Sequence, residues 1–376
     1  MMLKRSFKNL DGLRLIAAVF VIVGHSQSIL FEAKKISPYA PYFNKLASFG
    51  VDFFFVLSGF LISYMLFVEI ENTGKINIKN FLIRRSLRLW PLYFTVGILS
   101  LATAPLFVKF FDLPYTPPTT NGIIGNFLYL MGFSINHQIM IGHMNSYSSY
   151  TIAHFWSLSI EEQFYLLWAP VLYIGRKNTL VVILLFILIG WATTYYPPAI
   201  FDQWFGQNAY AAPYYFTVNR YFHFATGALM AWLVVHHPIL FDSKKYAILI
   251  KFVFIIVLAS ICIFLFGAYY WGDDERYVNG CISFVLLIMA IDTNSIFNLE
   301  YKWLKYLGKI SFGIYIYHIL GVRTSWKLLN LVGIAAESQL FWILFPLLAI
   351  ALSVGMAILS FEYFEQYFLR LKKKFY

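Results

Sequence analysis

Apolar segments long enough to cross a lipid bilayer recur along the whole sequence of 376 residues. A transmembrane helix needs about 20 consecutive, mainly apolar residues, so segments of this kind leave no room for a sizeable soluble domain. The composition agrees, because 60% of the residues are hydrophobic and only 12% are charged. The sequence therefore predicts an all-α fold, a polytopic helical bundle in a membrane, built as one domain over residues 1–376.

Ten segments are predicted to cross the membrane, with both ends of the chain in the cytoplasm. The loops on one side carry 18 Lys and Arg residues, and those on the other side carry 5. Cytoplasmic loops carry the excess of Lys and Arg in membrane proteins, which gives the orientation. The apolar segment 122–133 is too short to cross, and we expect it to be re-entrant or interfacial. The predicted spans are residues 11–31, 49–69, 89–111, 155–174, 179–196, 216–235, 247–269, 278–293, 307–324 and 340–362.

Several classes of function lack support in this sequence. The net charge of +11 is explained by the basic cytoplasmic loops and does not indicate a nucleic-acid partner. Cys262 and Cys281 both lie in apolar segments, so neither a disulfide framework nor a thiolate metal site is expected. His137, His143 and His154 share an outer loop at spacings that match no metal-ligand pattern, so no metal is predicted. Nucleotide-binding and serine-hydrolase motifs are also missing.

Arg14 and His25 are the two chemically informative residues of the first span. They lie eleven positions apart, which is about three helical turns, so both project from one helix face roughly 16 Å apart along the axis. An ionisable residue inside a membrane segment is a functional-site hypothesis by default, because an unpaired charge in hydrocarbon is costly. In the predicted orientation, Arg14 lies near the inner surface and His25 in the outer half of the membrane.

Glu161, in the segment HFWSLSIEEQFYLLW, is predicted to lie at nearly the same depth as His25. An imidazole beside a carboxylate is suited to general-base catalysis, since the carboxylate orients the ring and stabilises its charged form. The alternative is that His25 only forms a hydrogen bond to a neighbouring helix. Glu162 is expected to point elsewhere, because adjacent helix positions face different directions.

A basic cluster follows the second span, in KNFLIRRSLRLWPLY. Arg85 and Arg88 share a helix face, and Arg14 approaches from the same side of the membrane. Guanidinium groups bind phosphates in a bidentate manner, so these three residues are candidates for an anionic ligand. The alternative is anchoring to anionic lipid headgroups, which also attract basic residues at inner helix ends.

Five further polar residues in apolar segments are weaker candidates for substrate binding, although each is more often structural. They are Asp52, Arg220, His223, Tyr315 and His318. The pair Ser58-Gly59 is expected to permit a close approach between helices.

Read together, these segments resemble the acyltransferase family 3 membrane proteins, which include many bacterial polysaccharide O-acetyltransferases. The similar blocks occur in the same order over essentially the whole chain. They are LDGLRLIAAVFVIVGH, GVDFFFVLSGFLIS, FLIRRSLRLWPLYF, FWSLSIEEQFYLLWAP, RYFHFATGAL, ISFGIYIYH and FEYFEQYF.

The resemblance implies that Arg14 and His25 are essential and that Arg85 and Arg88 form the family's Arg-x-x-Arg element. It also implies that Glu161 is the family's Glu after Trp-Ser-Leu-Ser-x. It implies a multi-pass protein of the inner (plasma) membrane that uses acyl-CoA, usually acetyl-CoA, as co-substrate. The expected acceptor is a hydroxyl of a cell-surface or lipid-linked carbohydrate. Many members carry an additional soluble domain, and this chain resembles the stand-alone form. Transfer to the acceptor then falls to the membrane domain or to a separate periplasmic or extracellular partner.

Other functions remain open at this point. A proton-coupled transporter or flippase would use Arg14, His25 and Glu161 as a proton or anion relay. An enzyme that acylates a cytosolic small molecule, or a scaffolding membrane protein, are further alternatives. Direct transfer and an acyl-enzyme intermediate are both compatible with a catalytic His25.

Overall fold

A computed structural model describes residues 7–32, 40–114, 116–144, 146–195, 212–242, 275–291, 295 and 298–375 of the chain. The described residues form helices and the turns between them, with no strand among them, so the predicted all-α class is confirmed. The α-helices are α1 (Leu10–Glu32), α2 (Ala40–Thr73), α3 (Ile78–Phe110), α4 (Thr120–Met131), α5 (Ile135–Met140), α6 (Ser146–Ile152), α7 (Trp156–Ile174), α8 (Thr179–Tyr195), α10 (Ala212–Tyr215), α11 (Thr217–His236), α12 (Ile239–Asp242), α14 (Glu275–Ile291), α15 (Lys302–Lys309), α16 (Ser311–Leu331), α17 (Gln339–Ser360) and α18 (Gln366–Lys372). Short 3-10 segments, η1 (Ala153–Phe155) and η5 (Lys373–Phe375), and a π-helical turn, η4 (Phe361–Glu365), complete the list.

Each predicted span that falls on described residues overlaps one of these helices, whereas span 247–269 lies outside them. The largest difference is at α3, which begins at Ile78 rather than at residue 89. The side chain of Asn77 caps this helix by accepting a hydrogen bond from the backbone N–H of Asn80 at 3.0 Å. The basic segment after the cap contains no helix breaker, so the helix continues beyond its apolar part.

Four helical stretches of the described residues are long and apolar enough to cross a membrane: Leu10–Leu30, Lys45–Thr73, Ile78–Phe110 and Gln339–Phe375. Their length and composition fit a membrane protein. Helices α7, α11 and α16 have 19 to 21 residues but carry buried polar side chains, which lowers their hydropathy. The count of about ten spans and the cytoplasmic position of both ends therefore stay predictions.

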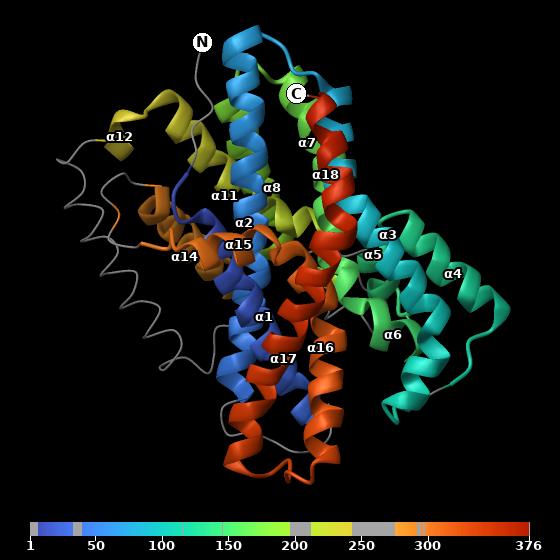
Figure 1. The fold of residues 1–376 in the computed structure, drawn as a ribbon. Coiled ribbons are helices and arrows are strands. Elements are labelled where there is room, and N and C mark those ends of the chain that lie inside the picture. Colours follow the sequence, from blue (N-terminus) through green and yellow to red (C-terminus); the bar gives the residue numbers. More distant parts are fainter. Residues whose placement is uncertain are drawn as a thin grey trace.

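Helices α1, α2, α16 and α17 run along the long axis of the molecule, with α4 to α6 on one flank and α11, α12 and α14 on the other (Figure 1). The turn between α2 and α3 lies at the same end as α18, and the turn between α16 and α17 lies at the opposite end (Figure 1). Helix α4 covers most of the segment 122–133, and its 12 residues are too few to cross a bilayer, as expected.

Two glycines bring α2 and α11 into backbone contact. A Cβ atom on Gly59 would lie 2.0 Å from the carbonyl oxygen of Phe224, and one on Gly227 would lie 2.0 Å from that of Val56. Small residues permit this kind of close helix approach in membranes. The prediction for the Ser58-Gly59 pair is confirmed at Gly59, and the tight crossing fixes the side of α2 that faces the functional site.

Candidate active site

A cavity, here called the main cavity, lies between α1, α2, α3, α7 and α16. The residues that line it are Arg14, Val51, Phe54, Phe55, Ser58, Leu61, Ile62, Arg85, Arg88, Leu89, Ser157, Leu158, Glu161, Tyr165, Ser311, Phe312 and Tyr315. Most of the wall is apolar, with a few charged and hydroxyl groups turned into it.

Three arginines line the main cavity, one from α1 and two from α3. Arg14, Arg85 and Arg88 lie near enough to one another for their charges to repel. Arg14 also contacts Asp11 at 3.5 Å, and the guanidinium of Arg85 lies 5.9 Å from the ring of Tyr165. The lining contains three arginines and one glutamate, so positively charged residue types outnumber negatively charged ones. This arrangement favours an anionic ligand, because guanidinium groups bind phosphate and carboxylate strongly.

Glu161 lies in the same cavity as these arginines. Its carboxylate accepts a hydrogen bond from the hydroxyl of Ser58 at 2.8 Å and another from the hydroxyl of Tyr165 at 3.0 Å. Arg14 and Arg85 are close enough to attract it electrostatically. Three helices thus hold the carboxylate in place, since Ser58 comes from α2, Arg14 from α1 and Tyr165 from the next turn of α7.

His25 lies in a separate group of rings, here called the histidine cluster, formed by His25, His154 and His318. The ring of His318 lies 4.8 Å from that of His25 and 4.9 Å from that of His154, both at steep angles. His318 and His154 are buried, and His25 is half-buried. His25 comes from α1, His154 from η1 and His318 from α16. The cluster therefore joins the first and ninth predicted spans to the start of α7.

Backbone carbonyls fix the tautomers of all three rings. Nδ1 of His25 lies 2.9 Å from the carbonyl oxygen of Val21, and Nε2 of His154 lies 3.0 Å from that of Ile316. Nδ1 of His318 bonds to the carbonyl oxygen of Tyr315. Because a carbonyl oxygen only accepts, the bonded nitrogen carries the proton and the other nitrogen of the neutral ring carries a lone pair. For His25 this places the basic lone pair on Nε2.

Tyr315 connects the main cavity with the histidine cluster. It lines the cavity, and its ring lies 5.2 Å from the ring of His318. Its hydroxyl donates to the carbonyl oxygen of His154 at 3.1 Å and is also bonded to Ser157. The predicted residues Tyr315 and His318 therefore lie at the boundary between the arginine-lined space and the ring of His25.

The structure does not bring His25 and Glu161 together as the sequence analysis expects. Among the described residues, the carboxylate of Glu161 is bonded to Ser58 and Tyr165, whereas Nδ1 of His25 is bonded to Val21 of its own helix. Similar depth in a bilayer does not decide which way a side chain points around the helix axis. Among the described residues, a backbone carbonyl is thus one group that orients His25, and Glu161 lies beside Arg14 and Arg85.

Asp52, Arg220 and His223 form a buried ion-pair network, and none of the three lines the main cavity. Nη1 of Arg220 lies 2.7 Å from Oδ1 of Asp52, with side chains 0% and 1% exposed. Nε2 of His223 lies 3.6 Å from the same oxygen, and the side chain of Asn279 donates to the other oxygen at 2.9 Å. The guanidinium also lies 4.4 Å from the ring centre of Tyr214. These contacts join α2, α11 and α14, and the substrate-binding role of the three residues stays a prediction.

Sequence reasoning missed several residues of the site. Tyr165 lies one turn after Glu161, a spacing that allows their side chains to meet. Ser58 was noted only for helix packing, although it bonds Glu161. His154 was set aside because its loop matched no metal pattern, yet it lies seven residues, or two turns, before Glu161. Glu162 does point elsewhere, since Nε1 of Trp90 donates to it at 2.8 Å.

Among the described residues, no group of three or more His, Cys, Asp or Glu side chains is arranged to hold a metal ion. The histidine cluster fits this, because one nitrogen of each ring is already bonded to a backbone carbonyl. The site combines an arginine-lined cavity with a nearby group of imidazole rings.

Comparison with known proteins gives a consistent result. The acyltransferase family 3 model, described as an acyltransferase domain, matches residues 7–361. The peptidoglycan O-acetyltransferase OatA of Listeria monocytogenes is 25% identical over 333 residues, covering 82% of this chain and 48% of that protein. The putative peptidoglycan O-acetyltransferase YrhL of Bacillus subtilis is 27% identical over 333 residues, covering 84% and 48%. A putative O-acetyltransferase of Staphylococcus aureus is 31% identical over 168 residues, covering 45% and 25%.

The chain thus spans about half the length of the first two of these relatives. No solved structure matches it significantly. The family model covers nearly the whole sequence, which confirms the resemblance drawn from the sequence blocks. The chain is a helical membrane protein that belongs to acyltransferase family 3.

Proposed function

We propose that this protein is a multi-pass enzyme of the inner membrane that moves an acyl group, most simply acetyl, from acyl-CoA to a carbohydrate hydroxyl. The observation that carries the proposal is the main cavity, where three arginines and a held carboxylate lie next to Tyr315 and the histidine cluster. The relatives support the reaction class, because they are named as O-acetyltransferases, two of them acting on peptidoglycan.

Arg14, Arg85 and Arg88 would bind the phosphates of the donor. Acyl-CoA is a polyanion with a long, thin arm, and the main cavity combines an excess of positive charge with mainly apolar walls. The phosphates would interact with the guanidinium groups, while the arm would extend along the wall toward Tyr315. Glu161 would hold Arg14 and Arg85 in position by attraction.

His25 would act as the general base. The acceptor hydroxyl would transfer its proton to Nε2 of His25 while its oxygen attacks the thioester carbonyl carbon. A C–O bond forms, the C–S bond breaks, and the proton then passes from the imidazolium to the departing thiolate, which leaves as coenzyme A. The carbonyl of Val21 holds the required tautomer of the ring. Tyr315 and His318 would position the ring and the thioester relative to each other.

A transfer assay with purified protein in lipid nanodiscs tests this proposal. The assay would combine isotope-labelled acetyl-CoA with soluble peptidoglycan disaccharide fragments and count acetyl groups on the sugar by mass spectrometry. We expect His25→Ala to lower the transfer rate at saturating donor by about 10²–10⁴-fold, the usual contribution of a general base. Its donor affinity should stay within about twofold of the wild type, since the imidazole is not assigned to phosphate binding.

His236→Ala is the matched control. Nδ1 of His236 also lies 2.9 Å from the carbonyl four residues earlier, that of Trp232, but this ring is exposed and outside the main cavity. Its removal should leave transfer unchanged. Normal transfer by folded His25→Ala protein would contradict the base assignment, and no transfer by the wild type to any hydroxyl acceptor would contradict the proposed function.

A further inference from the structure

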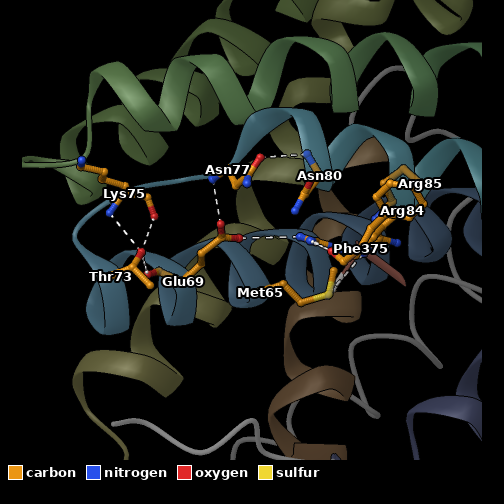
Figure 2. A network of polar contacts seen from close by, with 9 residues as sticks. All are labelled: Met65, Glu69, Thr73, Lys75, Asn77, Asn80, Arg84, Arg85 and Phe375. Carbon is orange, nitrogen blue, oxygen red and sulfur yellow. Dashed lines mark hydrogen bonds and ion pairs between the residues drawn. The ribbon is translucent and has the colours of Figure 1, made fainter. Parts of the chain in front are cut away.

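A second cavity lies beside the main cavity, at the end of the molecule where α2 turns into α3. It is lined by Tyr64, Met65, Val68, Glu69, Asn77, Asn80, Arg84 and Phe375. The proposed function makes no use of this space. Figure 2 shows its polar wall, where side chains from α2 and from the first turns of α3 converge on the end of the chain near Phe375.

Two charged residues of the second cavity hold its walls together. Oε1 of Glu69 accepts from the backbone N–H of Asn77 at 2.7 Å, and Oε2 lies 3.7 Å from the guanidinium of Arg84. Nη1 of Arg84 donates to the carbonyl oxygen of Phe375 at 2.8 Å. These contacts connect three segments of the chain, and they leave the cavity with nearly balanced charge.

The side-chain amide of Asn80 is the polar group best placed to bind a ligand. The hydrogen bond that Asn80 makes among the described residues uses its backbone N–H, which donates to Asn77. Its half-buried carboxamide points into the space between Glu69, Arg84 and Phe375 in Figure 2. A carboxamide offers a donor and an acceptor side by side. This pattern complements the 6-amino group and N7 of adenine.

Residues that line the second cavity lie next to residues that line the main cavity. Arg84 lines the former and Arg85 lines the latter. Met65 lines the second cavity, and its sulfur lies 3.5 Å from Nη2 of Arg85. A ligand that occupies both spaces would therefore pass beside two consecutive arginines, whose charges suit a phosphate group.

We infer that the second cavity binds the purine base of the donor nucleotide, with the carboxamide of Asn80 reading its amino edge. The inference rests on the proposed function, since it takes acyl-CoA as the donor. The base would lie among Tyr64, Phe375 and the planar guanidinium of Arg84, groups that stack on aromatic faces. The diphosphate would lie beside Arg84 and Arg85, and the acyl arm would continue into the main cavity.

Equilibrium binding to the purified full chain in nanodiscs tests the inference with three probes. The probes are acetyl-CoA, its hypoxanthine analogue, in which the 6-amino group is replaced by oxygen, and 4′-phosphopantetheine, which lacks the base. Wild-type protein should bind acetyl-CoA about tenfold more tightly than the hypoxanthine analogue, because a mispaired polar group weakens binding. Asn80→Leu should lose this preference and bind 4′-phosphopantetheine as the wild type does.

Asn330→Leu is the matched control, because Asn330 is exposed near the C-terminal end of α16 and does not line the second cavity. Its replacement should leave all three affinities unchanged. An equal affinity of the wild type for both bases, or the same preference in Asn80→Leu, would overturn the inference while leaving acyl-CoA as the donor. No binding of acetyl-CoA by the wild type would instead contradict the proposed function, and this inference with it. The wild-type comparison of the two bases does not depend on any variant folding.

Discussion

The main cavity and the buried ion-pair network contain the same kinds of side chain and use them differently. In the network, Asp52 and Arg220 are sealed from solvent, and both carboxylate oxygens are bonded. In the main cavity, three arginines surround one carboxylate and line open space. Charges that satisfy one another stabilise a fold, whereas an excess of one sign around a cavity is suited to a ligand. Burial and charge balance, more than residue type, separate the structural from the functional polar groups.

The largest effect expected from this comparison is on stability, at the network. Asp52→Asn should lower the free energy of unfolding in detergent micelles by about 3–5 kcal/mol, because it leaves the buried charge of Arg220 uncompensated. Asp112→Asn removes a carboxylate from an exposed pair with Lys327 and should cost less than about 1 kcal/mol. Chemical denaturation of both variants gives the comparison. Equal losses would mean that the network is no structural anchor.

At the main cavity, the expected effect is on donor binding instead. Arg85→Ala combined with Arg88→Ala should raise the Kd for acetyl-CoA by about 100-fold, since two charge-assisted hydrogen bonds contribute about 1.5 kcal/mol or more each. The unfolding free energy should change little. A titration of purified protein measures the affinity.

The control for that experiment is Arg176→Ala combined with Arg370→Ala, which removes two exposed arginines outside the cavity. This variant should bind the donor nearly as the wild type does. If it weakens binding as much as the cavity variant, the arginines act through overall charge, and the lipid-anchor interpretation of Arg85 and Arg88 returns.

The smallest effect concerns the position of Glu161. Tyr165→Phe removes the hydroxyl that donates to this carboxylate at 3.0 Å and leaves the bond from Ser58 in place. One hydrogen bond of this kind contributes about 1 kcal/mol, so transfer should slow by about fivefold. Tyr173→Phe, at an exposed tyrosine of the same helix, should leave the rate unchanged. Equal rates in all three proteins would show that Tyr165 does not position Glu161.

Sequence patterns predicted the helices well because apolar length depends on local composition. The start of α3 at Ile78 was not predicted, because its first turns are basic and depend on the cap from Asn77. Arg14, Arg85 and Arg88 were expected on the same side of the membrane, and all three line one cavity although Arg14 is far from the other two in sequence.

The direction of a side chain around its helix could not be predicted in the same way. His25 and Glu161 were expected to face each other, but helix rotation depends on packing, such as the glycine crossing at Gly59. The pairing of Asp52 with Arg220 had a usable signal, because opposite charges in neighbouring apolar segments need partners. The sequence signal for the histidine cluster was weak, and it consisted of the two-turn spacing from His154 to Glu161.

Photo-crosslinking of the donor tests the central claim most directly, namely that the main cavity is the acyl-CoA site. An acyl-CoA analogue with a photoreactive acyl group would be irradiated with the purified protein, and the labelled peptides would be identified by mass spectrometry. The account predicts labels on α16 near Tyr315 and on α7 near Ser157, suppressed by excess acetyl-CoA and lost in the Arg85 and Arg88 double variant. Labels confined to other helices, or labels that acetyl-CoA does not suppress, would contradict it.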